Sequence, residues 1–383
     1  MAQAPSAQAA PPRSEEAAAP TQAAPAPPTG PLTIALDACG ADRGPEVMAA
    51  AAKAVAKEGI RVRAFGLKPE LEHLVGIERV ELRRAEDAIS NDEEPVRAVH
   101  NKPSSSIVLA AQDVADGHSH ALVSAGSTGA ALAASVFSMR RLRGVHRPAI
   151  AVQIPRPEHP SEYVLLLDAG ANTENRPQHL VQFAYLGAAF SKAVLEVPRP
   201  RVGLLSVGEE PKKGTPAVVA AHEALASADG LEFVGNVEGR DLAAGTADVI
   251  VTDGFTGNIA LKTMEGTAKA VGGAIRGAAK SGPFALIGGL LMRRALKRVS
   301  SSLQPDTTGG AILLGLRGVT VIAHGSSGPE GIANAIRLAE RSVREQAVQR
   351  TADLLERSGA SRAAVRASLE QEGAKAAAGA ESE

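Results

Sequence analysis

Apolar runs that lead into glycine-containing polar loops and then into helical patterns recur along this chain. The clearest run is Val249-Ile-Val251, whose consecutive β-branched residues predict a strand covered on both faces of a sheet. Gly254 and Gly257 follow and predict a tight turn, after which a helix is expected to start at Asn258 and carry Lys262. Free N–H groups in its first turn, with Lys262 one turn further, would suit an anion, which we interpret as phosphate.

The same order of strand, loop and helix is repeated in four other places. Strands are predicted at 32–37, 120–124, 163–168 and 201–206, with helices at 46–57, up to 137, from about 178 and up to 227. Five such units predict an α/β fold, a doubly wound, mostly parallel sheet with helices on both faces. The loops after the strands are expected to gather at one carboxyl edge, where ligands bind.

Two further helical segments and two tails complete the pattern. The spacing of Ile332, Ile336, Ala339 and Val343 predicts one long helix from Pro329 to about Ser358, packed on the first half of the chain. Residues 1–30 and 371–383 are rich in Ala and carry no periodic apolar pattern, so we predict disordered tails.

Composition limits the classes of protein that this chain can represent. Apolar residues make up 44% of the 383 residues and aromatic residues 2%, so the core must consist of small and aliphatic side chains. Lys and Arg (41) nearly balance Asp and Glu (42), which argues against a protein that coats nucleic acid. The single cysteine, Cys39, excludes an internal disulfide framework and is compatible with a reducing cytosol.

Several familiar sequence signals are not found. No loop fits the dinucleotide or the ATP phosphate-loop pattern, so neither nicotinamide nor ATP is indicated. There is no secretory signal pattern and no uncharged apolar run of about 18 residues that would predict a membrane-spanning helix.

Eight short motifs occur in an order that resembles one protein family. They are Asp37-Ala-Cys-Gly-Ala-Asp42, Ser124-Ala-Gly-Ser-Thr-Gly129, Leu167-Asp-Ala-Gly-Ala-Asn172, Gln182-Phe-Ala184, Arg201-Val-Gly-Leu-Leu-Ser-Val-Gly-Glu-Glu210, Gly235-Asn-Val-Glu-Gly-Arg-Asp241, Asp253-Gly-Phe-Thr-Gly-Asn258 and His324-Gly-Ser-Ser327. Each motif alone is weak, but together, from about Leu32 to Ala339, they resemble the bacterial phosphate acyltransferase family of phospholipid synthesis.

The resemblance implies a specific activity and architecture. The family moves a long-chain fatty acyl group from acyl carrier protein to inorganic phosphate, and the acyl phosphate serves a later glycerol-3-phosphate acyltransferase. Its members resemble the Rossmann-like phosphotransacetylase and isopropylmalate dehydrogenase folds, with two lobes and a cleft. Here the lobes would be 31–150 with about 310–358, and 151–309. The resemblance also implies a homodimer, peripheral contact with the inner membrane from the cytoplasm, and no metal or organic cofactor.

The chemistry needs donors that hold phosphate and donors that face the oxyanion on the thioester carbon. We expect four residues to act in catalysis, namely Lys262, Asn258, Asp253 and His324. The residues expected to bind substrate are Asp37, Gly40, Asp42, Lys102, Ser104, Gly126, Ser127, Thr128, Gly129, Asp168, Asn172, Glu209, Lys213, Asn236, Glu238, Gly254 and Gly257. Plain alternatives stay open, because Lys262 can pair with Glu265, Asp253 and Asp168 can cap turns, and His324 can be structural.

The chain departs from the family pattern at a few positions. Ser127 and Ser206 stand where the family usually has Asn, and so does Thr215. His100-Asn101-Lys102 replaces a run of basic residues. The serine side chain is shorter than that of asparagine and has one donor in place of two, so these changes put the rate, the substrate preference or even the activity of the chain in doubt.

Residues 281–300 have a different character. Their second half places apolar residues on one helical face and cations on the other, as an interfacial helix at an anionic lipid surface requires. The residues expected to meet the membrane or the acidic carrier protein are Leu290, Leu291, Arg293, Arg294, Lys297 and Arg298. An ordinary surface or dimer helix is the alternative.

Two other functions remain open from the sequence. The departures are compatible with a catalytically weakened relative that binds carrier protein or membrane and organises lipid synthesis. A short-chain phosphotransacetylase that uses coenzyme A is the third class.

Overall fold

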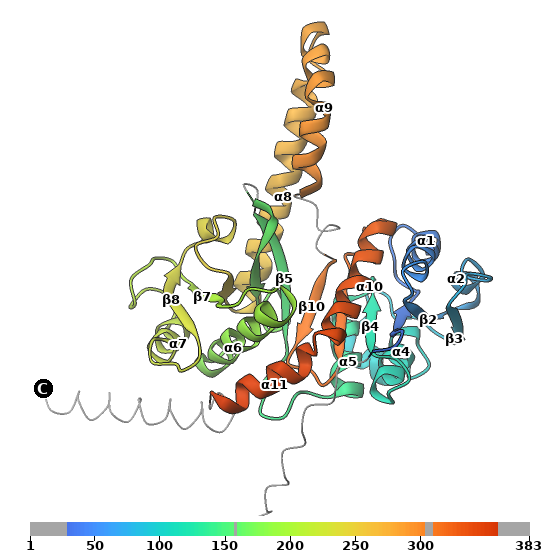
Figure 1. The fold of residues 1–383 in the computed structure, drawn as a ribbon, viewed down its shortest axis with the longest axis horizontal. Helices are drawn as coiled ribbons and strands as arrows, with labels where there is room; N and C mark the ends of the chain where they lie inside the picture. Colours follow the sequence, from blue (N-terminus) through green and yellow to red (C-terminus); the bar gives the residue numbers. More distant parts are fainter. Residues whose placement is uncertain (1–28, 157–158, 303–308, 359–383) are drawn as a thin grey trace, which may run out of the picture.

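One eleven-stranded sheet runs through the whole molecule in this computed structural model, which describes residues 29–156, 159–302 and 309–358, with the backbone alone at 160–161 and 293–302 (Figure 1). Its strand order is β3-β2-β1-β4-β11-β10-β5-β6-β9-β7-β8. One half contains β1 (Thr33–Asp37), β2 (Arg61–Gly66), β3 (Val80–Arg84), β4 (Ala121–Ser124), β10 (Ala311–Leu314) and β11 (Val319–Ile322). The other half contains β5 (Ala149–Arg156), β6 (His159–Leu167), β7 (Arg201–Leu205), β8 (Glu232–Val237) and β9 (Val249–Val251). The predicted α/β fold with a mostly parallel sheet is confirmed.

The two halves of the sheet run in opposite directions. Strands β1, β2, β3, β4 and β11 are mutually parallel, and so are β6, β7, β8 and β9. Between them, β10 is antiparallel to both β11 and β5, and β5 is antiparallel to β6. The expectation that all five loops meet at one carboxyl edge is therefore wrong, because this antiparallel centre reverses the second half.

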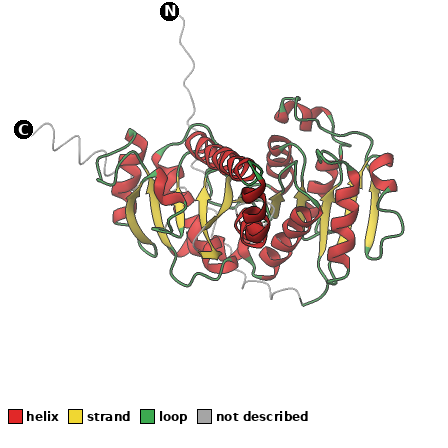
Figure 2. Cartoon of the chain, turned by 90° about the horizontal axis from the view of Figure 1, so that it is seen from above, coloured by secondary structure: helices red, strands yellow, loops and turns green. Residues whose placement is uncertain are grey.

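Helices cover both faces of the sheet, as Figure 2 shows. One face packs against α1 (Pro45–Ala56), α6 (Pro177–Val194), α7 (Pro216–Ala226), α10 (Pro329–Arg344) and α11 (Ala347–Arg357). The other face packs against α3 (Pro95–Asn101), α4 (Ser106–Ala115), α5 (Thr128–Met139) and α8 (Gly254–Ala278). The short helix α2 (Lys68–Glu72) packs on β2 and β3, and η1 (Gly239–Leu242) follows β8 and buries Leu242 against the second half of the sheet. Helix α9 (Pro283–Ser302) follows α8. Proline at the first helical position starts α1, α3, α6, α7 and α10, where its missing N–H costs no helical bond.

The predicted single helix from Pro329 to Ser358 is wrong in one respect. Gln346 adopts a left-handed conformation (φ 51°), which ends α10 and starts α11 in a new direction. As a result α10 packs on α1 in the first half, whereas α11 packs on α6 in the second half. The C-terminal segment thus ties the two halves together.

Helices α8 and α9 form an antiparallel pair that projects from the body (Figure 1). The two helices approach closely where Gly289 faces Ala279, since a Cβ at Gly289 would lie 2.9 Å from the Ala279 Cβ. Among the helices of residues 29–156, 159–302 and 309–358, none has the length and hydropathy of a membrane-spanning segment.

Candidate active site

Strand register brings the ends of the two oppositely directed halves to the same stretch of the sheet. Ile322 pairs with Ala311, Ala311 with Val152, and Val152 with Leu166. Strand β11 ends at Ile322 and β6 ends at Leu167, so their carboxyl ends lie within one residue of a common row. The loops that leave these strands therefore flank the middle of the sheet, although the strands run in opposite directions.

A cleft with a volume of about 230 Å³ lies over this central stretch of the sheet. Its floor comes from alternate residues of β5, which are Ile150, Val152 and Ile154. Helix α8 adds an apolar wall made of Leu261, Met264 and Ala268. The polar side chains that line it are Thr128, Gln153, Asn258, Lys262, Glu265 and His324. The cleft thus combines a long apolar surface with polar groups drawn from both halves.

The first turn of α8 is held by the protein itself. Asp253 caps the helix, and its carboxylate accepts the Thr256 N–H (2.8 Å) and the Thr256 hydroxyl (2.7 Å). The Gly254 N–H donates to the Asn172 carbonyl (2.8 Å), and the Gly257 N–H donates to the Asp253 carbonyl (2.9 Å). The predicted helix start at Asn258 is wrong, because the helix already begins at Gly254. These bonds already use the first-turn N–H groups of Gly254 and Thr256, which were expected to help hold the anion. The glycines are needed for close packing, since a Cβ at Gly254 would lie 2.6 Å from the Asn172 carbonyl oxygen.

The polar residues of α8 lie on its second and third turns instead. Lys262 Nζ pairs with a Glu265 carboxylate oxygen (2.9 Å), and both residues line the cleft. The Lys262 side chain is 51% exposed and that of Glu265 is 16% exposed, so the ammonium can still turn towards a ligand. Pairing and participation in the site are both compatible with this geometry.

Three loops of the first half converge beside the cleft. Gly40 lies directly on Gly126, since a Cβ at Gly40 would stand 2.6 Å from the Gly126 Cα. The Asp42 N–H donates to the Gly325 carbonyl (2.9 Å), which joins the first loop to the loop after β11. These contacts need backbone without side chains between the loops, which explains the glycines.

Two of these loops present polar groups to the cleft. Ser127 caps α5 by accepting the Ala130 N–H (3.4 Å), and Thr128 is exposed in the cleft. His324 Nδ1 accepts the Ser326 N–H (3.2 Å) and lies 2.9 Å from the Ser326 hydroxyl oxygen. In the neutral ring this places the proton on Nε2 and leaves that atom as the donor for a ligand.

Asp37 and Asp168 are buried and organise the loops from beneath. Asp37 accepts the Ser124 hydroxyl (2.8 Å) and the Cys39 N–H (3.2 Å), and burial raises the pKa of its carboxyl group to about 6. Asp168 accepts five hydrogen bonds, from the backbone N–H groups of Ile150, Gly170, Ala171 and Asn172 and from the Asn172 side chain. Both carboxylates are buried, so in this structure neither is in a position to make the direct contact with the substrate that the sequence had led us to expect.

Known proteins of one family resemble this chain along most of its length. Residues 32–350 match the family described as fatty acid synthesis protein. A phosphate acyltransferase of Thermobifida fusca is 44% identical over 325 residues, covering 83% of this chain and 89% of that one. One of Elusimicrobium minutum is 43% identical over 320 residues, covering 82% and 92%. The chain belongs to the phosphate acyltransferase family. Membership makes it an acyltransferase.

Solved structures agree with the fold. A phosphotransacetylase from Streptococcus pyogenes superposes with a TM-score of 0.55 at 15% identity, covering 83% of this chain and 94% of that chain. A branched-chain phosphotransacylase from Enterococcus faecalis gives 0.52 at 18% identity, covering 82% and 99%. At this level of identity the likeness concerns the arrangement of the sheet and helices.

Several residues that the family pattern suggested lie away from the cleft. Lys102 is held by Glu93 (3.0 Å), Asp87 (3.4 Å) and the Ala88 carbonyl (3.1 Å), so its charge is already neutralised, and Ser104 lies two residues further along the same segment. The rest form a separate network at the β7–β8 end of the sheet. There Arg240 pairs with Glu209 and Glu238, the Asn236 amide donates to the Glu210 carbonyl, and the Ser206 hydroxyl donates to the Lys213 carbonyl. The expected substrate contacts of Lys102, Ser104, Glu209, Lys213, Asn236 and Glu238 are not provided by this cleft.

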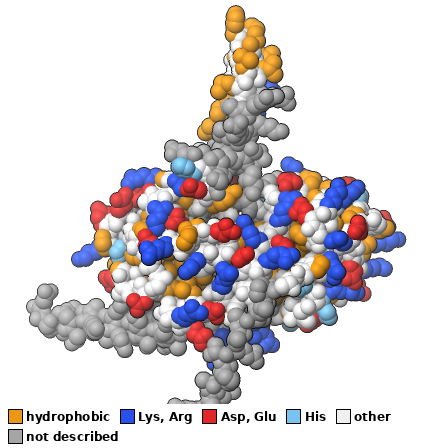
Figure 3. Space-filling view, in the orientation of Figure 1, with side chains coloured by type: hydrophobic (Ala, Val, Ile, Leu, Met, Phe, Trp, Pro, Cys, Tyr) orange, Lys and Arg blue, Asp and Glu red, His pale blue; other side chains and the backbone are white. Residues whose placement is uncertain are grey.

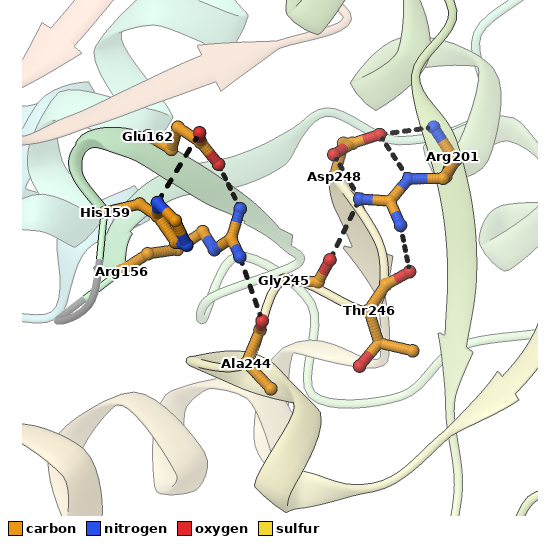
Figure 4. Close-up of polar contacts among 8 residues, drawn as sticks. All are labelled: Arg156, His159, Glu162, Arg201, Ala244, Gly245, Thr246 and Asp248. Carbon is orange, nitrogen blue, oxygen red and sulfur yellow. Dashed lines mark hydrogen bonds and ion pairs between the residues drawn. The ribbon is translucent and has the colours of Figure 1, made fainter.

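An arginine network that sequence reasoning missed braces the far end of the cleft (Figure 4). Arg156 pairs with Glu162 across the β5–β6 hairpin and donates to the Ala244 carbonyl (3.2 Å). Arg201 binds Asp248 (2.8 Å) and the carbonyls of Gly245 and Thr246 (both 2.9 Å). Because Pro155 and Ala243 line the cleft, these bonds fix its rim.

The apolar floor was also missed, although the sequence carried a signal for it. The alternation of Ile150, Val152 and Ile154 is typical of a strand with one distinct face. Only the structure shows that this face lies under α8 rather than under a filled core.

Proposed function

We propose that this chain transfers a long-chain fatty acyl group from acyl carrier protein to inorganic phosphate, and that the product acyl phosphate serves a later glycerol-3-phosphate acyltransferase. The observation that carries the proposal is the union of a hydrocarbon-lined surface and a set of hydrogen-bond donors in one cleft. Family membership supports the same reaction.

The reaction needs positioning more than acid catalysis. A phosphate oxygen attacks the thioester carbon, a tetrahedral oxyanion forms, and the carbon–sulfur bond breaks to release the carrier thiolate. A thiol has a pKa of about 8.5, so the sulfur leaves without a strong general acid. The protein must therefore hold phosphate beside the thioester and stabilise the oxyanion.

The donors of the cleft can be assigned to these two tasks. We assign phosphate to Lys262 and Asn258 on α8, with Glu265 holding the ammonium in place until phosphate arrives. The oxyanion is assigned to Thr128, the first-turn N–H groups of α5 and His324 Nε2–H. The N–H groups of Thr128 and Gly129 support this, since no hydrogen bond within the described residues engages them and the positive end of the α5 dipole lies there.

The apolar surface would receive the acyl chain. From Asn258 to Ala268 the helix rises roughly 15 Å at 1.5 Å per residue, and Ile154 and Met264 lie along this path. Burial of each methylene contributes about 0.8 kcal/mol, so a long chain gains more than a short one. This favours long-chain substrates over the acetyl group.

The projecting α8–α9 pair is proposed as the dimer and membrane element. Phe284 is 89% exposed, Leu291 81% and Leu290 68%, and hydrophobic side chains gather on the projection in Figure 3. Soluble chains rarely leave such a patch open, so we propose that a second copy covers the shaft and that the tip contacts the lipid surface peripherally from the cytoplasm. The cationic side chains Arg293, Arg294, Lys297 and Arg298 lie outside the described side chains.

A vesicle assay tests the membrane proposal. Leu290→Ser with Leu291→Ser should reduce co-sedimentation with anionic vesicles at least about tenfold, because two apolar anchors are lost. Val75→Ser, an exposed apolar residue far from the projection, serves as the matched control. Undiminished binding of the double variant would reject the membrane role, and sedimentation velocity of the same variants reports the dimer.

Acyl phosphate formation tests the enzymatic proposal. Lys262→Ala should lower kcat/KM about a hundredfold, the typical effect of removing one group that stabilises developing charge. Lys269→Ala, which removes an exposed lysine from the same helix, should leave turnover unchanged. A folded wild-type chain that forms no acyl phosphate from acyl carrier protein thioester and phosphate would reject the proposal and favour the organising role. Preference for a coenzyme A thioester would favour the phosphotransacetylase alternative.

A further inference from the structure

The loop between α5 and β5 carries a concentration of positive charge that the cleft does not use. Residues 139–148 contain four arginines and one histidine with no acidic residue. Two further arginines join them in space, and the six exposed side chains of this basic edge are Arg140, Arg141, Arg143, Arg147, Arg176 and Arg317. Within the described residues, none of the six forms an ion pair with an acidic side chain.

The contacts between these residues define one surface. Arg317 donates its N–H to the Arg140 carbonyl (3.0 Å) and its Nε–H to the Arg141 carbonyl (3.2 Å). Arg141 donates to the His146 carbonyl, and the His146 ring lies 5.5 Å from the His179 ring at the start of α6. Arg176 occupies the N-cap position of that helix, and its N–H donates to His179 Nδ1 (3.2 Å). The positive dipole end of the helix adds to the field. Burial together with the charges of Arg147, His146 and Arg176 lowers the pKa of His179 to about 4, as expected where the potential is positive.

The basic edge is rigid because a buried amide holds the loop. Gln182 accepts the His146 N–H (2.8 Å) and donates to the Gly144 carbonyl (2.8 Å). The Leu142 N–H bonds the Gly315 carbonyl (2.9 Å), which fixes the loop to the β10–β11 turn. A loop backbone preorganised in this way lowers the ordering cost of binding a partner.

The position of the basic edge favours a protein partner over the membrane. Figure 1 shows this loop at the end of the molecule opposite the α8–α9 projection, so one membrane cannot contact both. The loop leads straight into the cleft, since Arg147 precedes the floor residue Ile150 by three residues, or roughly 10 Å of extended chain. Arginine also suits carboxylate partners, because its guanidinium binds them in a bidentate manner.

We propose that the basic edge is the docking surface for the acidic carrier protein that presents the acyl thioester. This inference rests on the proposed function and names the surface that its protein substrate uses. The carrier protein would bind at this end, the thioester would reach the donors of the cleft, and the acyl chain would extend along α8 away from the carrier.

The test compares two double charge reversals. Arg143→Glu with Arg147→Glu should raise the KM for acyl carrier protein thioester at least about tenfold, with kcat and the KM for phosphate unchanged, because like charges now face the partner. Lys192→Glu with Arg199→Glu makes the same change in net charge on exposed residues at the other end of α6 and should have no effect. In wild type, the KM for the carrier substrate should rise with salt.

Binding of unacylated carrier protein, measured by calorimetry, separates the failure of this inference from failure of the proposed function. A wild-type chain that shows no turnover would reject the proposed reaction. Loss of carrier binding in the Arg143/Arg147 variant would still support the docking surface in that case. Unchanged binding and KM in that variant would overturn it. So would loss of anionic vesicle binding with carrier binding intact, or a carrier defect produced only by Arg293→Ala with Arg294→Ala.

Discussion

Two glycines on α8 should respond in opposite ways to the same substitution. A Cβ at Gly257 would overlap the Asp168 carbonyl oxygen and lie 2.9 Å from the Thr252 methyl carbon, whereas a Cβ at Gly266 meets nothing within 4 Å. Asp168 cannot retreat, because its carboxylate is fixed by five hydrogen bonds. Gly257→Ala must therefore displace the start of α8, and Gly266→Ala need displace nothing.

The magnitudes follow from these two environments. Overpacking against fixed backbone costs about 3 kcal/mol or more, and the better helix propensity of alanine returns about 1 kcal/mol, so Gly257→Ala should lose about 2 kcal/mol of stability. Gly266→Ala, exposed in mid-helix, should gain about 0.5–1 kcal/mol. The two variants should thus differ by about 3 kcal/mol.

Urea unfolding of both variants measures this difference as a change in midpoint at constant slope. Gly257→Ala should also lower kcat/KM for acyl phosphate formation, because Asn258 and Lys262 move with the helix, while Gly266→Ala should keep full activity. Equal midpoints, or a Gly257→Ala variant more stable than wild type, would refute the close contact between α8 and the loop after β6.

Two further predictions concern buried polar groups. The folded pKa of Asp37, about 6, exceeds the ordinary value of 3.8, so its stabilising effect is complete below pH 4 and is lost as the pH rises through 6. The Asp37→Asn variant has no carboxyl group to ionise, so its free energy of unfolding relative to wild type should rise by about 3 kcal/mol between pH 4 and pH 7.5. A difference between variant and wild type that does not change with pH would contradict the burial argument. Gln182→Leu leaves the His146 N–H and the Gly144 carbonyl without the amide and should cost roughly 2–5 kcal/mol. Hydrogen exchange at His146 should then accelerate, and unchanged protection would show that the loop is held by other contacts.

Local signals in the sequence predicted the individual elements well. The consecutive β-branched residues at Val249–Val251 form a buried strand, and the prolines at 45 and 329 start helices. Both signals act within a few residues, since burial on two faces selects β-branched side chains and the fixed φ of proline suits the first helical turn.

Long-range features were not predictable in the same way. Reversal of the second half depends on β10 entering between β11 and β5, a pairing between residues more than 150 positions apart. Neutralisation of Lys102 by Asp87 and Glu93 depends on how two loops fold back on each other. Motif order therefore identified the family, whereas it could not decide which motif residues face the ligand.

Helix α8 explains why separate motifs converge on one function. Its capped first turn is fixed to the loop after β6, its second and third turns line the cleft with Asn258, Lys262 and Leu261, and its later turns form the projection with α9. A helix of 25 residues spans roughly 37 Å, so a single rigid element connects the anchored loop, the donors and the exposed tip. Any partner or lipid that tilts the projection must move Lys262 relative to His324, which belongs to the other half of the sheet. The proposed attachment at the tip would therefore act on the geometry of the cleft through this helix.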